Sequence, residues 1–240
     1  SFEQAKALLF SLGAIDAKER ITAHGKKMAT FPMHPRLAHM ILIADQFGQG
    51  QLALTIAALL AERDLLNLNQ DQKTVDLRLR LDALEYVKNN DLKSARKLGC
   101  SIGVAQNILK QINVWRQKHQ ISRSAIEIEK AGLCLAVAYP DRIAALRASG
   151  TRAYLLTNGR GAKLREDDPL GLEKYIAIGD LDKGQKDTRI FMAAPISKTE
   201  IEIYFKHIIR KEQEILWNDK DEAVKTNMKV MLDRIPLSVS

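Results

Sequence analysis

The chain has 240 residues, of which 46% are hydrophobic and 28% charged, and its formal net charge is +8. This composition permits a packed core, and no stretch approaches the roughly 20 apolar residues that a membrane-spanning helix requires, so no membrane partner is expected. Cys100 and Cys134 are too few for a disulfide framework and stand in apolar, helical contexts. They predict buried thiols and a cytoplasmic location.

Positive charge is concentrated in two stretches of the chain. Residues 78–123 hold 10 basic and 3 acidic side chains, and residues 131–165 hold 6 basic and 1 acidic side chain. The rest of the chain is therefore slightly acidic. Such clustering favours a phosphate-binding face. Lys and Arg on the solvated faces of helices would give the same composition, so both interpretations stay open at this point.

The first part of the chain, residues 1–48, predicts a small helical unit whose beginning is missing. Apolar residues follow helical spacing over 2–12, and Gly13 ends that helix as a C-terminal glycine. Thr22 is a natural N-cap for a second helix, and a third begins at Arg36. The chain begins with neither an initiator Met nor a signal-type segment, so we expect it to be a fragment of a longer protein.

The middle of the chain, residues 49–139, predicts a helical bundle. The apolar pattern indicates helices over 51–62 and 102–119, a helix capped by Thr74, and a last helix from about Ser124 towards Pro140. Residues 67–73 form a polar linker.

Three side-chain positions in this bundle can be assigned from helical spacing. In the helix after Thr74, Arg78 and Arg80 fall away from the centre of the leucine stripe. Trp115 has apolar neighbours at helical spacing and is expected in the core rather than as a platform for stacking bases.

Residues 140–216 predict a small antiparallel barrel with a following helix. Short β-type runs occur at 154–156, 175–178 and 188–193, with turns at Asn158-Gly159 and Lys183-Gly184. Ser197 and Glu200 form a capping box for a helix that is expected to reach about Lys211. The barrel is expected to be OB-like, residues 217–240 to begin a C-terminal extension, and the whole chain to be α+β and multidomain.

Sequence signals for catalysis are absent. The chain contains no G-x-x-x-x-G-K-[ST] loop, no G-x-G-x-x-G opening a helix, no H-E-x-x-H and no C-x-x-C. Asp167-Asp168 could serve as a carboxylate pair, but the adjacent Pro169 favours a surface turn. No catalytic residue, cofactor-binding residue or metal ligand is therefore predicted, and the chain is not expected to be an enzyme by itself.

The segment Tyr154 to Arg165 carries the clearest positive signal. Its tight turn presents Arg160 between two glycines, so backbone amides together with Arg160, Lys163 and Arg165 suit the phosphates of a single strand. Arg152 or Tyr154 could add a planar group against a base. The alternative is a hairpin that needs glycine for positive φ, with arginines that are only solvated.

Eight short motifs follow one another along the chain: Leu12-Gly-Ala-Ile-Asp16, Pro32-Met-His-Pro-Arg-Leu37, Leu59-Leu-Ala-Glu-Arg-Asp64, Asp76-Leu-Arg-Leu-Arg80, Tyr139-Pro-Asp-Arg-Ile-Ala144, Asn158-Gly-Arg-Gly161, Asp180-Leu-Asp182 and Ala193-Ala-Pro-Ile196. In this order they resemble the C-terminal half of HrpB-type helicases, which are bacterial DEAH-box (DExH, superfamily 2) ATP-dependent RNA helicases. The resemblance implies a partial winged-helix unit, a ratchet-like bundle and an OB-like barrel. The P-loop, DEAH box and arginine fingers of the family's RecA-like motor have no counterpart here.

The resemblance implies a non-catalytic region that binds and guides single-stranded RNA, or DNA, beside the motor. ATP and Mg²⁺ would bind to the motor. Bundle residues 76–119 and the loop 158–165 would then face the strand, with Arg152, Arg160, Lys163 and Arg165 as phosphate contacts. Arg142 would be another contact, although its place after Pro140-Asp141 also suits a structural ion pair. A second hypothesis is a protein-interaction platform whose OB-like domain binds a partner protein instead of RNA.

Overall fold

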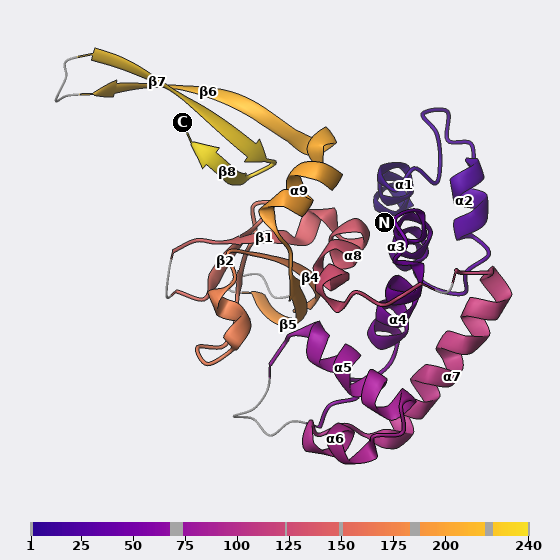
Figure 1. Ribbon diagram of the computed structural model, residues 1–240. Coiled ribbons are helices and arrows are strands. Elements are labelled where there is room, and N and C mark those ends of the chain that lie inside the picture. The colour runs from indigo at the N-terminus through magenta and orange to yellow at the C-terminus, as the bar shows by residue number, and fades with distance from the viewer. Residues whose placement is uncertain are drawn as a thin grey trace.

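The computed structural model describes residues 2–67, 74–122, 124–148, 151–182, 188–218 and 223–239, with the backbone alone at 214–218, 223–227 and 239. Along the chain, helices are followed by a barrel and then by a separate sheet (Figure 1). No helix in these ranges combines the length and apolar character needed to cross a bilayer. The predicted turn at Lys183-Gly184 and the linker residues 68–73 lie outside the described residues.

The N-terminal unit consists of helices α1 (Phe2–Ser11), α2 (Ala23–Met28) and α3 (Pro35–Gln46). Gly13 has a φ of 66°, a conformation that glycine adopts without strain, and it follows the end of α1 as predicted. The Gly25 N–H donates to Thr22 Oγ1 at 2.9 Å, which confirms Thr22 as the N-cap of α2.

The bundle contains the described helices α4 (Gly50–Ala61), α5 (Leu77–Lys88), α6 (Leu92–Lys97), α7 (Ile102–His119) and α8 (Ala131–Ala138). Every residue of α8 is buried, because this helix lies between α3 and α4 on one side and the barrel strands on the other (Figure 1). Trp115 on α7 is buried, so its predicted place in the core is confirmed.

Two predicted helix starts in the bundle are wrong. Asp76, not Thr74, caps α5 by accepting a hydrogen bond from the Arg78 N–H at 2.9 Å. The last helix begins at Ala131 after a 3₁₀ turn (Ile128–Lys130) instead of near Ser124. Glu127, which precedes this turn, is extended, and the Gln49 side chain makes two hydrogen bonds with it, to its carboxylate (2.8 Å) and its backbone N–H (3.2 Å).

Arg80 lies away from the centre of the leucine stripe of α5, as predicted, but it is buried. Its side chain is only 5% exposed and its Nη2 lies 2.7 Å from Asp64 Oδ2. Nη1 donates to the carbonyls of Thr74 and Asp76 at 2.6 and 3.0 Å. Helical spacing places Arg80 correctly on a flank of the helix, but the chain leading from α4 covers that flank.

The barrel is formed by β1 (Ile143–Leu146), β2 (Ala153–Leu156), β3 (Gly161–Lys163), β4 (Tyr175–Leu181) and β5 (Thr188–Pro195). These strands close in the order β1-β2-β3-β5-β4, with β3 and β5 parallel and the other pairs antiparallel. Alternate residues such as Tyr154, Leu156, Ile176 and Ile190 fill the interior. The predicted α+β fold with a small closed barrel is confirmed. The barrel is not wholly antiparallel as predicted, because β3 and β5 run parallel.

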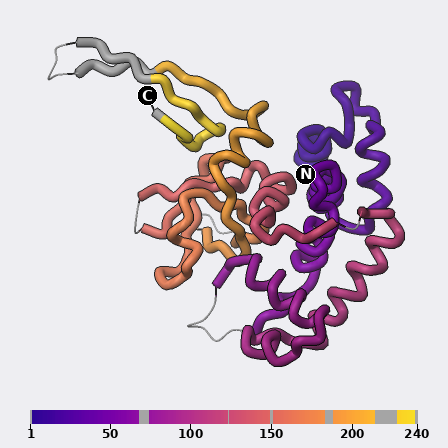
Figure 2. Tube along the Cα trace, in the orientation of Figure 1, coloured from indigo at the N-terminus to yellow at the C-terminus, as the bar shows by residue number. Residues whose placement is uncertain are grey.

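The chain ends in a sheet that the sequence does not predict. Helix α9 (Lys198–Tyr204) begins at the predicted capping box but stops well before Lys211, and the buried Phe205 is its C-cap residue. After a 3₁₀ turn, β6 (Ile209–Asn218), β7 (Ala223–Leu232) and β8 (Ile235–Val239) form an antiparallel sheet that extends away from the helices (Figures 1 and 2).

The terminal sheet is joined to the main core at its base. Leu232 and Ile235 are fully buried there, beside the nearly buried Leu237. The domain boundaries at residues 48, 139 and 216 stay predictions, and the last of them falls within β6.

Candidate nucleic-acid interface

The β2–β3 hairpin presents the loop that the sequence singles out. Its strands pair antiparallel with Tyr154 opposite Ala162, and Gly159 has a φ of 84°. The Arg160 N–H donates to Asn158 Oδ1 at 3.0 Å, which fixes the turn. Arg160 is exposed, and its guanidinium donates to Thr188 Oγ1 at 3.3 Å, so the turn is also tied to the start of β5.

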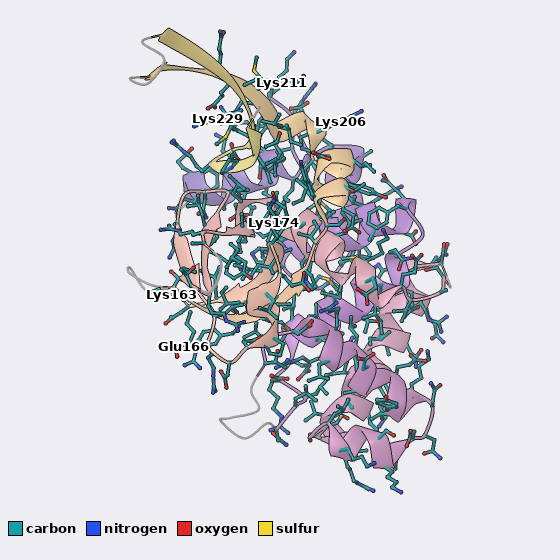
Figure 3. The ribbon with its side chains drawn as sticks, turned by 60° about the vertical axis from the view of Figure 1, so that its left-hand side comes forward. Lys163, Glu166, Lys174, Lys206, Lys211 and Lys229 are labelled. Atoms are coloured by element: carbon teal, nitrogen blue, oxygen red, sulfur yellow. The ribbon has the colours of Figure 1, made fainter. Side chains whose placement is uncertain are left out.

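Strand pairing places three basic side chains in one row on the outside of the barrel. The Arg147 N–H donates to the Ala153 carbonyl at 2.9 Å, Ala153 pairs with Lys163, and Lys163 pairs with Arg189. Neighbouring strands lie about 4.8 Å apart, so the row from Arg147 to Arg189 spans about 15 Å. The three basic residues are exposed, and Figure 3 shows Lys163 on the outer side of the barrel.

An aromatic ring and a further arginine adjoin this row. Phe191, two residues after Arg189 on β5, is 43% exposed, and the Arg189 Cζ lies 5.8 Å from its ring centroid. Arg165 follows β3 and contacts the Asp167 carboxylate through Nε and Nη2, each at 3.1 Å. This guanidinium holds the pKa of Asp167 below its usual value. We refer to Arg147, Lys163, Arg165, Arg189 and Phe191 together as the outer basic face.

Basic side chains around an exposed ring suit a single strand of nucleic acid. Cations neutralise the phosphates, and an aromatic ring can stack on any base because every base has a π-face. The structure thus brings Lys163 and Arg165 together on one surface and keeps Arg160 at the hairpin turn beside it.

Arg152 and Tyr154 occupy structural positions instead. Tyr154 is fully buried in the barrel, where its hydroxyl contacts the carbonyls of Leu170 (3.0 Å) and Glu173 (2.8 Å). Its burial raises its pKa and prevents it from stacking on a base, so that prediction is wrong. The Arg152 guanidinium donates to the Asp168 carbonyl and packs against Gly171.

Arg142 is also held within the fold. Its Cζ lies 4.3 Å from the ring centroid of Tyr139, and its Nη1 donates to the Gly179 carbonyl at 3.0 Å. The ion pair with Asp141 that the sequence suggests for Arg142 is made by Arg36 of α3, whose Nη1 lies 2.6 Å from Asp141 Oδ1. Arg142 therefore joins the start of the barrel to β4.

Asp168 is not in a surface turn, contrary to the sequence prediction. The residue is 1% exposed, and its carboxylate accepts hydrogen bonds from the backbone N–H groups of Val75 and Leu170, both at 2.9 Å. It joins the chain before α5 to the barrel. Across the ranges that the structure describes, no group of three or more metal-ligating side chains was found.

Three members of the outer basic face were missed by sequence reasoning: Arg147, Arg189 and Phe191. Alternation in the predicted strand 188–193 already places Arg189 and Phe191 on the same side, away from Ile190. Nothing local shows that this side adjoins Lys163, since that depends on the parallel pairing of β3 with β5.

Comparison with known proteins relates the chain to RNA helicases. The family model described as "Helicase associated domain (HA2), winged-helix" matches residues 7–33. The ATP-dependent RNA helicase HrpB of Escherichia coli (strain K12) is 28% identical over 98% of this chain, which covers 26% of that protein. The probable ATP-dependent RNA helicase DHX35 of Homo sapiens is 35% identical over 80 residues, 33% of this chain and 11% of that protein.

Solved structures agree with these relatives. A crystal structure of E. coli DEAH/RHA helicase HrpB matches 100% of this chain with 25% identity and a TM-score of 0.69, and the chain covers 27% of it. A crystal structure of E. coli DExH-box NTPase HrpB has the same fold over the whole chain, with a TM-score of 0.75 at 23% identity and 26% of that chain covered. Along almost its whole length, the chain is therefore similar to the C-terminal region of HrpB-type DEAH-box helicases, as its motifs indicate.

Proposed function

We propose that this chain is the accessory region of an ATP-dependent RNA helicase and that its barrel binds and guides single-stranded RNA. The outer basic face carries this proposal. Arg147, Lys163 and Arg189 stand in one row and are exposed, and Phe191 adjoins them. A basic surface beside an aromatic ring is the combination that OB-type barrels use for single strands.

The chain itself contributes grip and positioning in this proposal, and a RecA-like motor contributes turnover. ATP and Mg²⁺ would bind to that motor, in the cytoplasm. The chain spans 26% of the curated relative that it matches over 98% of its own length, which leaves ample sequence for such a motor in a protein of that kind.

Salt dependence of binding tests the proposal. For single strands, log K falls by about 0.7 per phosphate contact for each tenfold rise in salt. Three contacts by Arg147, Lys163 and Arg189 therefore predict that affinity falls at least about 20-fold between roughly 50 and 200 mM salt. Removing two of them in Lys163→Ala/Arg189→Ala should make that fall about sevenfold smaller. Fluorescence anisotropy with a labelled 12-nucleotide oligouridine measures both.

A matched control removes the same charge elsewhere. Lys26 and Lys27 are exposed on α2, which lies across the molecule from the barrel (Figure 1). Lys26→Ala/Lys27→Ala should retain the steep salt dependence. Weak, salt-independent binding by the unsubstituted chain would reject the proposal and favour the protein-interaction platform. Equal effects of the two double variants would reject the outer basic face as the site.

A further inference from the structure

We propose that the terminal sheet supplies a second wall of the RNA-binding site, with Arg234 as its phosphate-binding residue. This inference rests on the proposed function and extends it beyond the barrel. It starts from the close approach of the Arg234 side chain to the β2–β3 hairpin. Cγ of Arg234, in the turn between β7 and β8, lies 3.7 Å from the position that a Cβ on Gly159 would occupy.

Arg147 makes the corresponding approach to the other glycine of the hairpin. Its Nη2 lies 3.2 Å from the position that a Cβ on Gly161 would occupy. The two glycines on either side of Arg160 are thus each approached by an arginine from a different segment of the chain. Because a glycine has no side chain, each arginine can lie directly against the hairpin backbone.

The turn that carries Arg234 is held in a defined place. Leu232 and Ile235, the residues that flank the turn, are fully buried in the main core. Asp233 has a φ of 50°, and its carboxylate accepts a hydrogen bond from Arg210 Nη2 at 3.4 Å. The buried neighbours fix the base of the Arg234 side chain, while Arg234 itself is exposed.

The guanidinium groups of Arg147 and Arg234 are available for a ligand. Within the described part of the chain, neither group forms an ion pair, a side-chain hydrogen bond or a cation–π contact. The ion pair of the turn belongs to Asp233 and Arg210, which leaves the Arg234 charge uncompensated by its neighbour. Paired N–H groups of a guanidinium match two oxygens of a phosphate, so a phosphodiester is the ligand chemistry that fits.

The added arginine lengthens the binding surface along the β2–β3 hairpin. Arg234 lies at the Gly159 turn, Arg147 lies over Gly161, and Lys163 and then Arg165 follow along β3. At about 3.3 Å per residue, the chain from residue 159 to 165 spans at most about 20 Å. A surface of this length accommodates a strand of about four nucleotides, the lower end of the range for one OB-type barrel.

Arginine substitution in the full chain tests this inference. At about 0.1 M salt, one lost phosphate contact should weaken binding about fivefold and make the log–log salt slope shallower by about 0.7. Arg234→Ala should show both effects on the oligouridine. Arg234→Lys, which keeps the charge, should restore most of the slope.

Lys211→Ala is the control because Lys211 is an exposed cation of the same sheet (Figure 3). It should leave affinity and slope unchanged, and thermal unfolding followed by circular dichroism should show all variants folded. In one outcome, the unsubstituted chain binds RNA with a steep salt slope while Arg234→Ala has the same affinity and slope as Lys211→Ala. That result rejects the role of Arg234 and leaves the proposed function standing. If the unsubstituted chain shows no salt-dependent binding, both are rejected.

Discussion

Replacing Arg80 with alanine should destabilise the fold while leaving the RNA affinity of the folded chain unchanged. The sequence places Arg80 in a basic stretch that the family resemblance would turn towards RNA. In the structure its guanidinium is 5% exposed and bonded to Asp64 and to the carbonyls of Thr74 and Asp76. This arginine therefore connects the end of α4 to the start of α5.

The expected loss of folding free energy depends on how well the Asp64 carboxylate is solvated once Arg80 is removed. Breaking a buried ion pair by removing one partner typically costs about 3–5 kcal/mol. The Asp64 side chain is 41% exposed, so water can solvate its carboxylate after the arginine is removed. This reduces the expected loss to about 2–3 kcal/mol, or a fall in Tm of about 4–12 °C for a chain of this size.

Urea unfolding, followed by circular dichroism, measures the free energy of unfolding, and anisotropy measures RNA binding of the same variant. Lys88→Ala is the control because it removes a surface pair with Glu85, whose loss should change stability by less than about 0.5 kcal/mol. The reasoning fails if Arg80→Ala unfolds at the wild-type urea concentration yet binds RNA more weakly, since Arg80 would then face the strand.

Three further substitutions test the fold. Tyr154→Phe removes a hydroxyl that contacts two backbone carbonyls and should cost about 1–2 kcal/mol in urea unfolding. Burial and the neighbouring His24 lower the pKa of His39 to about 4, so the native state keeps it neutral. Stability should then be full above about pH 6.5 and fall by up to about 3 kcal/mol as the pH drops towards 4, a loss that His39→Gln should largely remove. Gly132→Ala would press a methyl group into the Pro195 carbonyl and should lower Tm by at least about 5 °C in a thermal melt, whereas Gly103→Ala, where the space is open, should not.

Features set by neighbouring residues were predictable from the sequence. The Thr22 cap, the Asn158-Gly159 turn and the Ser197–Glu200 capping box each depend on contacts within a few residues. A side chain that bonds to the next turn of backbone leaves its signal in the local residue pattern. These features are accordingly found where the pattern puts them.

Features set by distant pairing were not predictable in the same way. Asp168 bonds to the backbone of Val75, 93 positions away in the chain, and no local pattern shows which backbone a carboxylate will meet. The terminal sheet was missed for a similar reason, because a strand is defined by its partner as well as by its own residues. Lys163 was found from its hairpin, whereas Arg147 and Arg189 join it only when the barrel closes.

Photo-crosslinking to single-stranded RNA tests the central claim most directly. The chain would be irradiated with an oligouridine that contains 4-thiouridine, and the crosslinked peptides identified by mass spectrometry. Crosslinks are expected at Phe191 on β5 and in the β2–β3 hairpin, and they should be lost in Lys163→Ala/Arg189→Ala but retained in Lys26→Ala/Lys27→Ala. Two results would contradict the barrel as the RNA-binding surface. One is crosslinks confined to the helices, and the other is no crosslink to the barrel at a salt concentration at which the chain binds the RNA.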